Sequence, residues 1–99
     1  MKTILLSVFA ISISIGLSAQ VGINNSAPKA TVDITATNTG ATTAEGLIAP
    51  RLTGNQIKDK DAQYTAAQAG TLIYATSAVI SPTTKTNKIT RSGYYFFDG

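Results

Sequence analysis

Any chemistry in this chain would come from carboxylates and phenols, because it contains no histidine and no cysteine. Without these residue types, Ser-His-Asp and Cys-His nucleophiles and His/Cys zinc sites are excluded within the chain. General acid–base chemistry is left to the five acidic residues and the four tyrosines. The acidic residues are Asp33, Glu45, Asp59, Asp61 and Asp98.

The spacing of these carboxylates does not bring a pair together. Asp59 and Asp61 are the closest, but two positions on a helix lie about 200° apart around its axis. As a calcium loop, this run lacks the later acidic ligands and the glycine that such loops need. The glycines form no dinucleotide- or phosphate-binding pattern. We therefore predict a protein that is not an enzyme, with no catalytic residues, no cofactor and no metal site.

The charge pattern argues against nucleic acid as a partner. The net charge is +3, but no basic stripe is interleaved with aromatic residues, as it would be on a nucleic-acid surface. Lys58 and Lys60 alternate with Asp59 and Asp61, so the densest cluster of charges cancels itself.

The first residues indicate export. Residues 1–19 combine a basic start at Lys2, an apolar stretch over 4–17, and small residues before Gln20. This is the layout of a secretory signal peptide, and the apolar stretch is shorter than the roughly 18 residues that span a bilayer. We expect cleavage after Ala19, a secreted or outer-cell-surface location and no membrane span in the mature chain. A membrane anchor or a buried helix is the alternative for the same residues.

The exported part has little material for a core of its own. Cleavage would leave 80 of the 99 residues, of which 15, about 19%, are Leu, Ile, Val or Phe. That fraction is at the edge of what supports an independent core. No cysteine is present to supply a disulfide, and the low net charge argues against disorder. We therefore expect self-association or further C-terminal sequence to complete the core.

Residues 20–35 are predicted to form an N-terminal strand segment. Val21–Ile23 is strand-like, and in the stretch that follows the turn, Val32 and Ile34 alternate with polar residues, which is typical of a half-buried strand. Residues 36–45 have no large apolar side chain and are predicted to be a polar linker.

Residues 46–99 are predicted to begin with an extended segment and a helix. Pro50 cannot donate to a central ladder, so its segment is an edge strand or an extended lead-in. Thr53 and Gln56 have the spacing of a capping box, which predicts a short helix over 54–61.

The rest of this module is predicted to be a β-hairpin. Residues 62–69 extend the helix or form a loop anchored by Tyr64. Residues 71–76 and 93–98 are rich in β-branched and aromatic side chains and are expected to pair antiparallel. The turn is expected near Pro82, and further apolar residues would lengthen the two arms: Val79, Ile80 and Ile89. The fold class is therefore mainly β with one short helix, a small α+β fold.

The last strand is apolar on both faces, because Tyr94 and Phe96 point one way and Tyr95 and Phe97 the other. Such a strand requires cover on both sides. Either it is sandwiched within this domain, or the sequence is truncated or the strand packs against other chains; we favour the second. These four residues and Tyr74 are the candidate interface.

The chain resembles a module repeated in exported surface proteins of the Bacteroidetes, notably flavobacteria, and in phage tail-fibre-like proteins. The resemblance lies in the run 46–53 (GLIAPRLT), then 70–74 (GTLIY), then 93–99 (GYYFFDG), preceded by the strand segments 21–24 and 28–34. It implies a fibre or surface component that is often multimeric, and it brings no catalytic residues. The tryptophan expected after Asp-Gly is missing, which indicates an N-terminal fragment.

The expected function is a non-enzymatic structural or interaction module of a secreted or cell-surface, adhesin-like protein. The alternative is an exported module that binds carbohydrate or another ligand. In that case Tyr64, Tyr74, Tyr94 and Tyr95 would offer stacking faces to a surface glycan.

Overall fold

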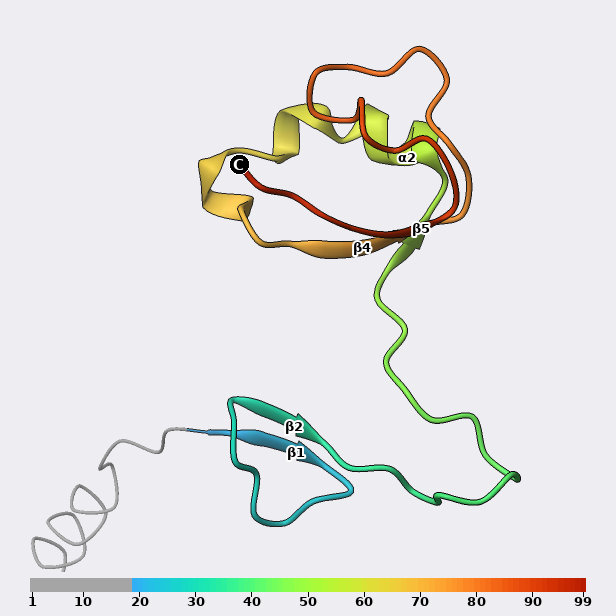
Figure 1. The fold of residues 1–99 in the computed structure, drawn as a ribbon. Helices are drawn as coiled ribbons and strands as arrows, with labels where there is room; N and C mark the ends of the chain where they lie inside the picture. The colour runs from blue at the N-terminus through green and yellow to red at the C-terminus, as the bar shows by residue number, and fades with distance from the viewer. Residues whose placement is uncertain (1–18) are drawn as a thin grey trace, which may run out of the picture. The chain divides into compact units, whose positions relative to one another are not determined.

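A computed structural model describes residues 19–99, which lie in two compact units divided between Glu45 and Gly46 (Figure 1). Apart from Ala19, the expected signal peptide lies outside the described residues. We call residues 19–45 the N-terminal unit and residues 46–99 the C-terminal unit. None of the helices within residues 19–99 has the length and apolar character needed to cross a bilayer.

The N-terminal unit contains two strands, β1 (Val21–Ile23) and β2 (Val32–Ile34), which confirms both predicted strands. They pair in parallel, with Val21 opposite Val32. The connection is short for parallel strands, and the Asp33 carboxylate holds it in place. One oxygen of this carboxylate accepts hydrogen bonds from the Asn25 side-chain amide at 2.9 Å and from the Lys29 N–H at 2.8 Å.

The prediction of a half-buried strand around Val32 is wrong about which face of the strand is covered. Val32 and Ile34 are 57% and 40% exposed, whereas the polar Asp33 between them is half-buried. The reason is the connection itself, because its hydrogen bonds to Asp33 draw residues 24–31 over the polar face. The apolar face of this two-stranded sheet is left to solvent.

Residues 36–45, the predicted linker, form a turn held by the Glu45 carboxylate. Its two oxygens accept hydrogen bonds from the N–H groups of Thr37 and Asn38, each at 3.0 Å, and from the Thr43 hydroxyl at 2.7 Å. The Asn38 side chain closes the turn from inside by accepting from the Gly40 N–H at 2.6 Å. The bond from Thr43, followed by those from Thr37 and Asn38, lowers the pKa of Glu45 below its ordinary value of 4.5.

We expect acidification to open this turn. Because the pKa of Glu45 is lowered in the folded turn, its stabilisation is present above pH 4.5 and is lost as the pH falls through the lowered pKa. The amide resonances of Thr37 and Asn38 should therefore titrate together with a midpoint below 4.5. In Glu45→Gln the titration should vanish. A midpoint at or above the ordinary value would show that the carboxylate does not hold the turn.

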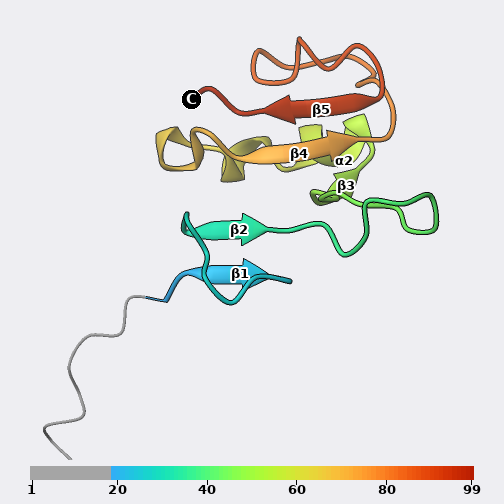
Figure 2. The same cartoon turned by 60° about the horizontal axis from the view of Figure 1, so that its bottom comes forward.

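The C-terminal unit is built on a three-stranded sheet in the order β3-β4-β5. Its strands are β3 (Arg51–Leu52), β4 (Leu72–Ala75) and β5 (Gly93–Phe96). β4 and β5 pair antiparallel, as predicted, with Leu72 opposite Phe96 and Tyr74 opposite Tyr94 (Figure 2). β3 lies at the edge, parallel to β4, which agrees with the edge position predicted from Pro50.

The helix α2 (Gly54–Asp59) begins where the capping box predicted it. The Thr53 hydroxyl accepts from the Gln56 N–H at 3.1 Å, and the Gln56 side chain accepts from the Thr53 N–H at 2.9 Å. α2 stops short of the expected end. Two 3-10 helices follow: η1 (Asp61–Gln63) and η2 (Ala66–Gln68).

The segment between β4 and β5 does not lengthen the hairpin. A single backbone bond, from the Val79 N–H to the Ile89 carbonyl at 3.0 Å, joins its two sides. The turn lies at 84–88 and overlaps the predicted turn after Pro82 at Thr84. The segment is tied to the helical layer instead. The Lys58 ammonium donates to the Ile80 carbonyl at 2.9 Å, and the Lys85 ammonium donates to the Asp61 carbonyl at the same distance.

The core lies between the sheet and this helical layer. It consists of Ile57 from α2, Ile73 and Ala75 from β4, and Ile89 from the connecting segment. The partly buried Leu52, Val79 and Tyr95 pack against it. The core is small, as the apolar content predicted.

Candidate functional site

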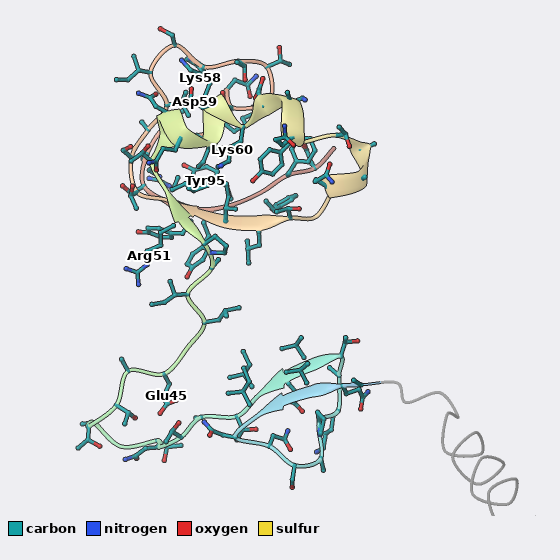
Figure 3. The ribbon with its side chains drawn as sticks, turned by 180° about the vertical axis from the view of Figure 1, so that it is seen from behind. Glu45, Arg51, Lys58, Asp59, Lys60 and Tyr95 are labelled. Atoms are coloured by element: carbon teal, nitrogen blue, oxygen red, sulfur yellow. The ribbon has the colours of Figure 1, made fainter. Side chains whose placement is uncertain are left out.

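The side of the sheet that faces away from α2 is exposed and largely apolar. Along β4 burial alternates: Ile73 and Ala75 are buried in the core, whereas Leu72 is exposed and Tyr74 half-buried. In β5 the same alternation exposes Tyr94 and Phe96. Arg51 of β3 pairs with Tyr74 and lies on this side of the sheet, whereas Tyr95 lies between sheet and helix (Figure 3). We call Arg51, Leu72, Tyr74, Tyr94 and Phe96 the open face.

The open face has a fixed local geometry. The rings of Tyr74 and Tyr94 meet edge to face, with centroids 5.0 Å apart. The Tyr94 hydroxyl donates to the Leu47 carbonyl at 3.0 Å, which ties the lead-in to β3 against the same face. Edge-to-face pairs of this kind contribute about 0.5–1.5 kcal/mol beyond the area that they bury. Tyr74 and Tyr94 are therefore held in place by contacts within the C-terminal unit.

The large apolar side chains of the open face are exposed to solvent. Leu72 is 47% exposed, Tyr94 53% and Phe96 70%. Leu47 and Ile48, which precede β3, are also exposed. A contiguous patch of large apolar side chains on a small protein marks an interaction surface or an aggregation hazard.

The structure divides the predicted interface between the two sides of the sheet. Tyr74, Tyr94 and Phe96 lie on the open face. Tyr95 packs against the core, and its hydroxyl donates to the Arg91 carbonyl at 2.7 Å. Phe97 meets the ring of Tyr64 edge-on, with centroids 5.4 Å apart.

The core side of the sheet also borders an open cavity of about 440 Å³. Its lining includes Ile57 and Ile73 from the core, together with Tyr64, Lys85 and Phe97.

Two members of the open face, Leu72 and Arg51, are missed by the sequence prediction, and only Leu72 has a local signal. Leu72 alternates with Ile73, so a strand with one buried face exposes one of the two. Arg51 follows Pro50 on an edge strand, but only the parallel register beside Tyr74 brings it to this face. That register joins residues distant in sequence, and no local pattern encodes it.

Three of the carboxylates accept hydrogen bonds from other residues of the chain. Asp33 holds the β1–β2 connection and Glu45 holds the turn that follows. Asp61 accepts a hydrogen bond from the Thr83 hydroxyl at 3.0 Å. In the described part of the chain, no three acidic, histidine or cysteine side chains gather where they could hold a metal ion.

Comparisons with protein-family models, with curated proteins and with solved structures give no match to this chain.

Proposed function

We propose that this chain is a non-enzymatic interaction module of a secreted or cell-surface protein, and that it self-associates through the open face. The observation that carries the proposal is the exposure of Leu72, Tyr94 and Phe96 on one ordered side of the sheet. The proposed export rests on the signal-peptide pattern of residues 1–19.

The energetics favour covering this face. An aromatic side chain buries roughly 150–250 Å², so Phe96 at 70% exposure leaves more than 100 Å² in water. A partner that covers half of that area would contribute about 1.5–2 kcal/mol. Left uncovered, the same surface promotes non-specific association.

We expect Phe96→Ser to weaken self-association about 10- to 30-fold, which corresponds to that contribution. Because Phe96 is 70% exposed, the thermal stability of the monomer should change little. Ile80→Ser is the matched control, since Ile80 is also 70% exposed but lies outside the open face. Sedimentation equilibrium over a concentration series measures the effect on the exported chain, and the mass of that product tests cleavage after Ala19.

A wild-type chain that stays monomeric over the whole series would overturn self-association. Equal weakening by Phe96→Ser and Ile80→Ser would overturn the role of the open face. The alternative function, glycan binding, requires a ring face that a sugar can reach, and Tyr94 on the open face is the tyrosine that offers one, at 53% exposure. Glycan-array binding that is lost in Tyr94→Ala, by a chain that does not self-associate, would favour that alternative.

A further inference from the structure

The outer edge of β5 is unpaired in the C-terminal unit, because the sheet has the order β3-β4-β5. Just beyond β5 in the same ladder, the Phe97 N–H donates to the Thr71 carbonyl at 2.9 Å. Antiparallel ladders alternate bonded and non-bonded pairs, so Ile73 and Tyr95 are a bonded pair. Tyr94 and Phe96 then belong to non-bonded pairs, and their N–H and C=O groups point away from β4.

The hydrogen bonds between β4 and β3 support this alternation of bonded and non-bonded pairs independently. The Tyr74 N–H donates to the Pro50 carbonyl at 3.0 Å, and the Thr76 N–H donates to the Leu52 carbonyl at 2.8 Å. Tyr74 therefore directs its backbone towards β3, as a residue in a non-bonded pair with Tyr94 must. Apart from the β4–β5 ladder, no backbone hydrogen bond within residues 19–99 involves Tyr94 or Phe96.

We propose that β5 pairs antiparallel, edge to edge, with β5 of a second copy of this chain, which rests on the proposed self-association and places its contacts at Tyr94 and Phe96 of the open face. Only one register uses both outward-facing residues of each strand: Tyr94 opposite Phe96 of the second copy, and the reverse. This register forms two bonded pairs about the twofold axis at Tyr95 and places an aromatic ring beside an aromatic ring on the open face, a favourable cross-strand pairing.

The charges that flank β5 select the antiparallel direction. Arg91 precedes the strand and Asp98 follows it, and both are exposed. In antiparallel pairing each Arg91 lies close to Asp98 of the other copy, whereas parallel pairing would place like charges together. β5 also contains no proline and no lysine, which are residues that blunt sheet edges.

Edge pairing joins two open faces into one surface. The two sheets become a single six-stranded sheet, and the aromatic side chains of both copies form a continuous band across the twofold axis. The twofold interface is closed, because each copy uses its one β5 edge.

Disulfide trapping tests the pairing, and the absence of native cysteine makes the trap specific. In the proposed register Ser92 lies opposite Asp98 of the second copy, in a bonded pair about 5.5 Å apart between Cα atoms, within disulfide range. Within one copy the two positions are about 20 Å apart along the strand. Exported full-length S92C/D98C should therefore form a covalent dimer under oxidising conditions, whereas S92C or D98C alone should not. Failure of the double variant to cross-link in an associated sample would overturn the pairing.

Charge reversal gives a second test at exposed positions that the fold tolerates. Asp98→Arg and Arg91→Asp should each weaken dimerisation about threefold to tenfold, as expected for two exposed ion pairs turned repulsive. The double variant R91D/D98R should restore it, and a mixture of the two single variants should form heterodimers. Dimerisation unchanged by either reversal would overturn the pairing.

The outcomes separate this inference from the proposed function. Association that is lost in Phe96→Ser but insensitive to charge reversal and without a cross-link would keep the open face as the interface and reject the β5 edge. A wild-type chain that never associates would reject both.

Discussion

Gly54→Ala should destabilise the C-terminal unit by about 3 kcal/mol or more, although alanine is the better helix former. Gly54 is the first residue of α2 and is buried against the segment that follows β4. A Cβ at this position would lie 2.6 Å from the Val79 nitrogen and closer still to the Ala78 carbonyl. Both are backbone atoms, so relief requires the segment to move, and overpacking of this kind costs about 1–3 kcal/mol, occasionally more.

The measurement is urea or thermal unfolding followed by the near-ultraviolet circular dichroism of tyrosine. All four tyrosines lie in the C-terminal unit and the chain has no tryptophan, so the signal reports on that unit alone. Gly70→Ala is the control: its Cβ would meet nothing within 4 Å, and only its positive φ of 90° is unfavourable. That conformational strain should cost about 1–2 kcal/mol. An equal or larger loss in the control would contradict the steric explanation.

Ile73→Ala should cost about 2–5 kcal/mol, whereas Leu72→Ala, one residue earlier, should change the stability by less than about 1 kcal/mol. The two side chains occupy opposite faces of β4. Ile73 is 8% exposed and packs with Ile57 and Ile89, and Leu72 is 47% exposed on the open face. Truncating Ile73 also enlarges the cavity that it lines, which adds to the loss.

When self-association is measured, the order of the two effects should be reversed, and Leu72→Ala should have the larger one. Leu72→Ala removes the cross-strand neighbour of Phe96 on the open face and should weaken self-association, whereas Ile73→Ala should act on unfolding first. The same tyrosine signal and sedimentation equilibrium separate the two effects. If both variants destabilised the monomer equally, β4 would have no solvent-facing side.

The elements whose determinants are local were predictable. The Thr53–Gln56 capping box acts within one helical turn, so sequence spacing alone located the start of α2. A second capping box, between Thr65 and Gln68, lies at the start of η2 and follows the same rule. It was not predicted, because those residues lack an apolar stripe. Alternation and β-branched content were enough to pair 71–76 with 93–98.

The features that depend on distant contacts were not predictable from patterns. The parallel pairing of Val21 with Val32 depends on how Asp33 ties down the connection. The sequence predicts Ile89 in a hairpin arm, but it is buried in the core, and bonds from Lys58 and Lys85 join its segment to the helical layer. To predict the open face, one must know which residues of a strand share a face and on which side of the sheet α2 packs. Alternation along the strand gives the first, but only the second decides which aromatic residues remain in water.

The shortness of β3 has a consequence for how many copies can join. Its outer edge offers the backbone of one residue, Arg51, because Pro50 and Leu52 direct their carbonyl groups towards β4. A sheet with two usable edges would add copies at both and grow into a filament without a fixed length. Under the proposed pairing the β3 edge is too short to take part and the β5 edge is used once, so addition would stop at two. If β3 detached from β4, with the loss of the bonds to Tyr74 and Thr76, the second edge would open and the stoichiometry would no longer be limited.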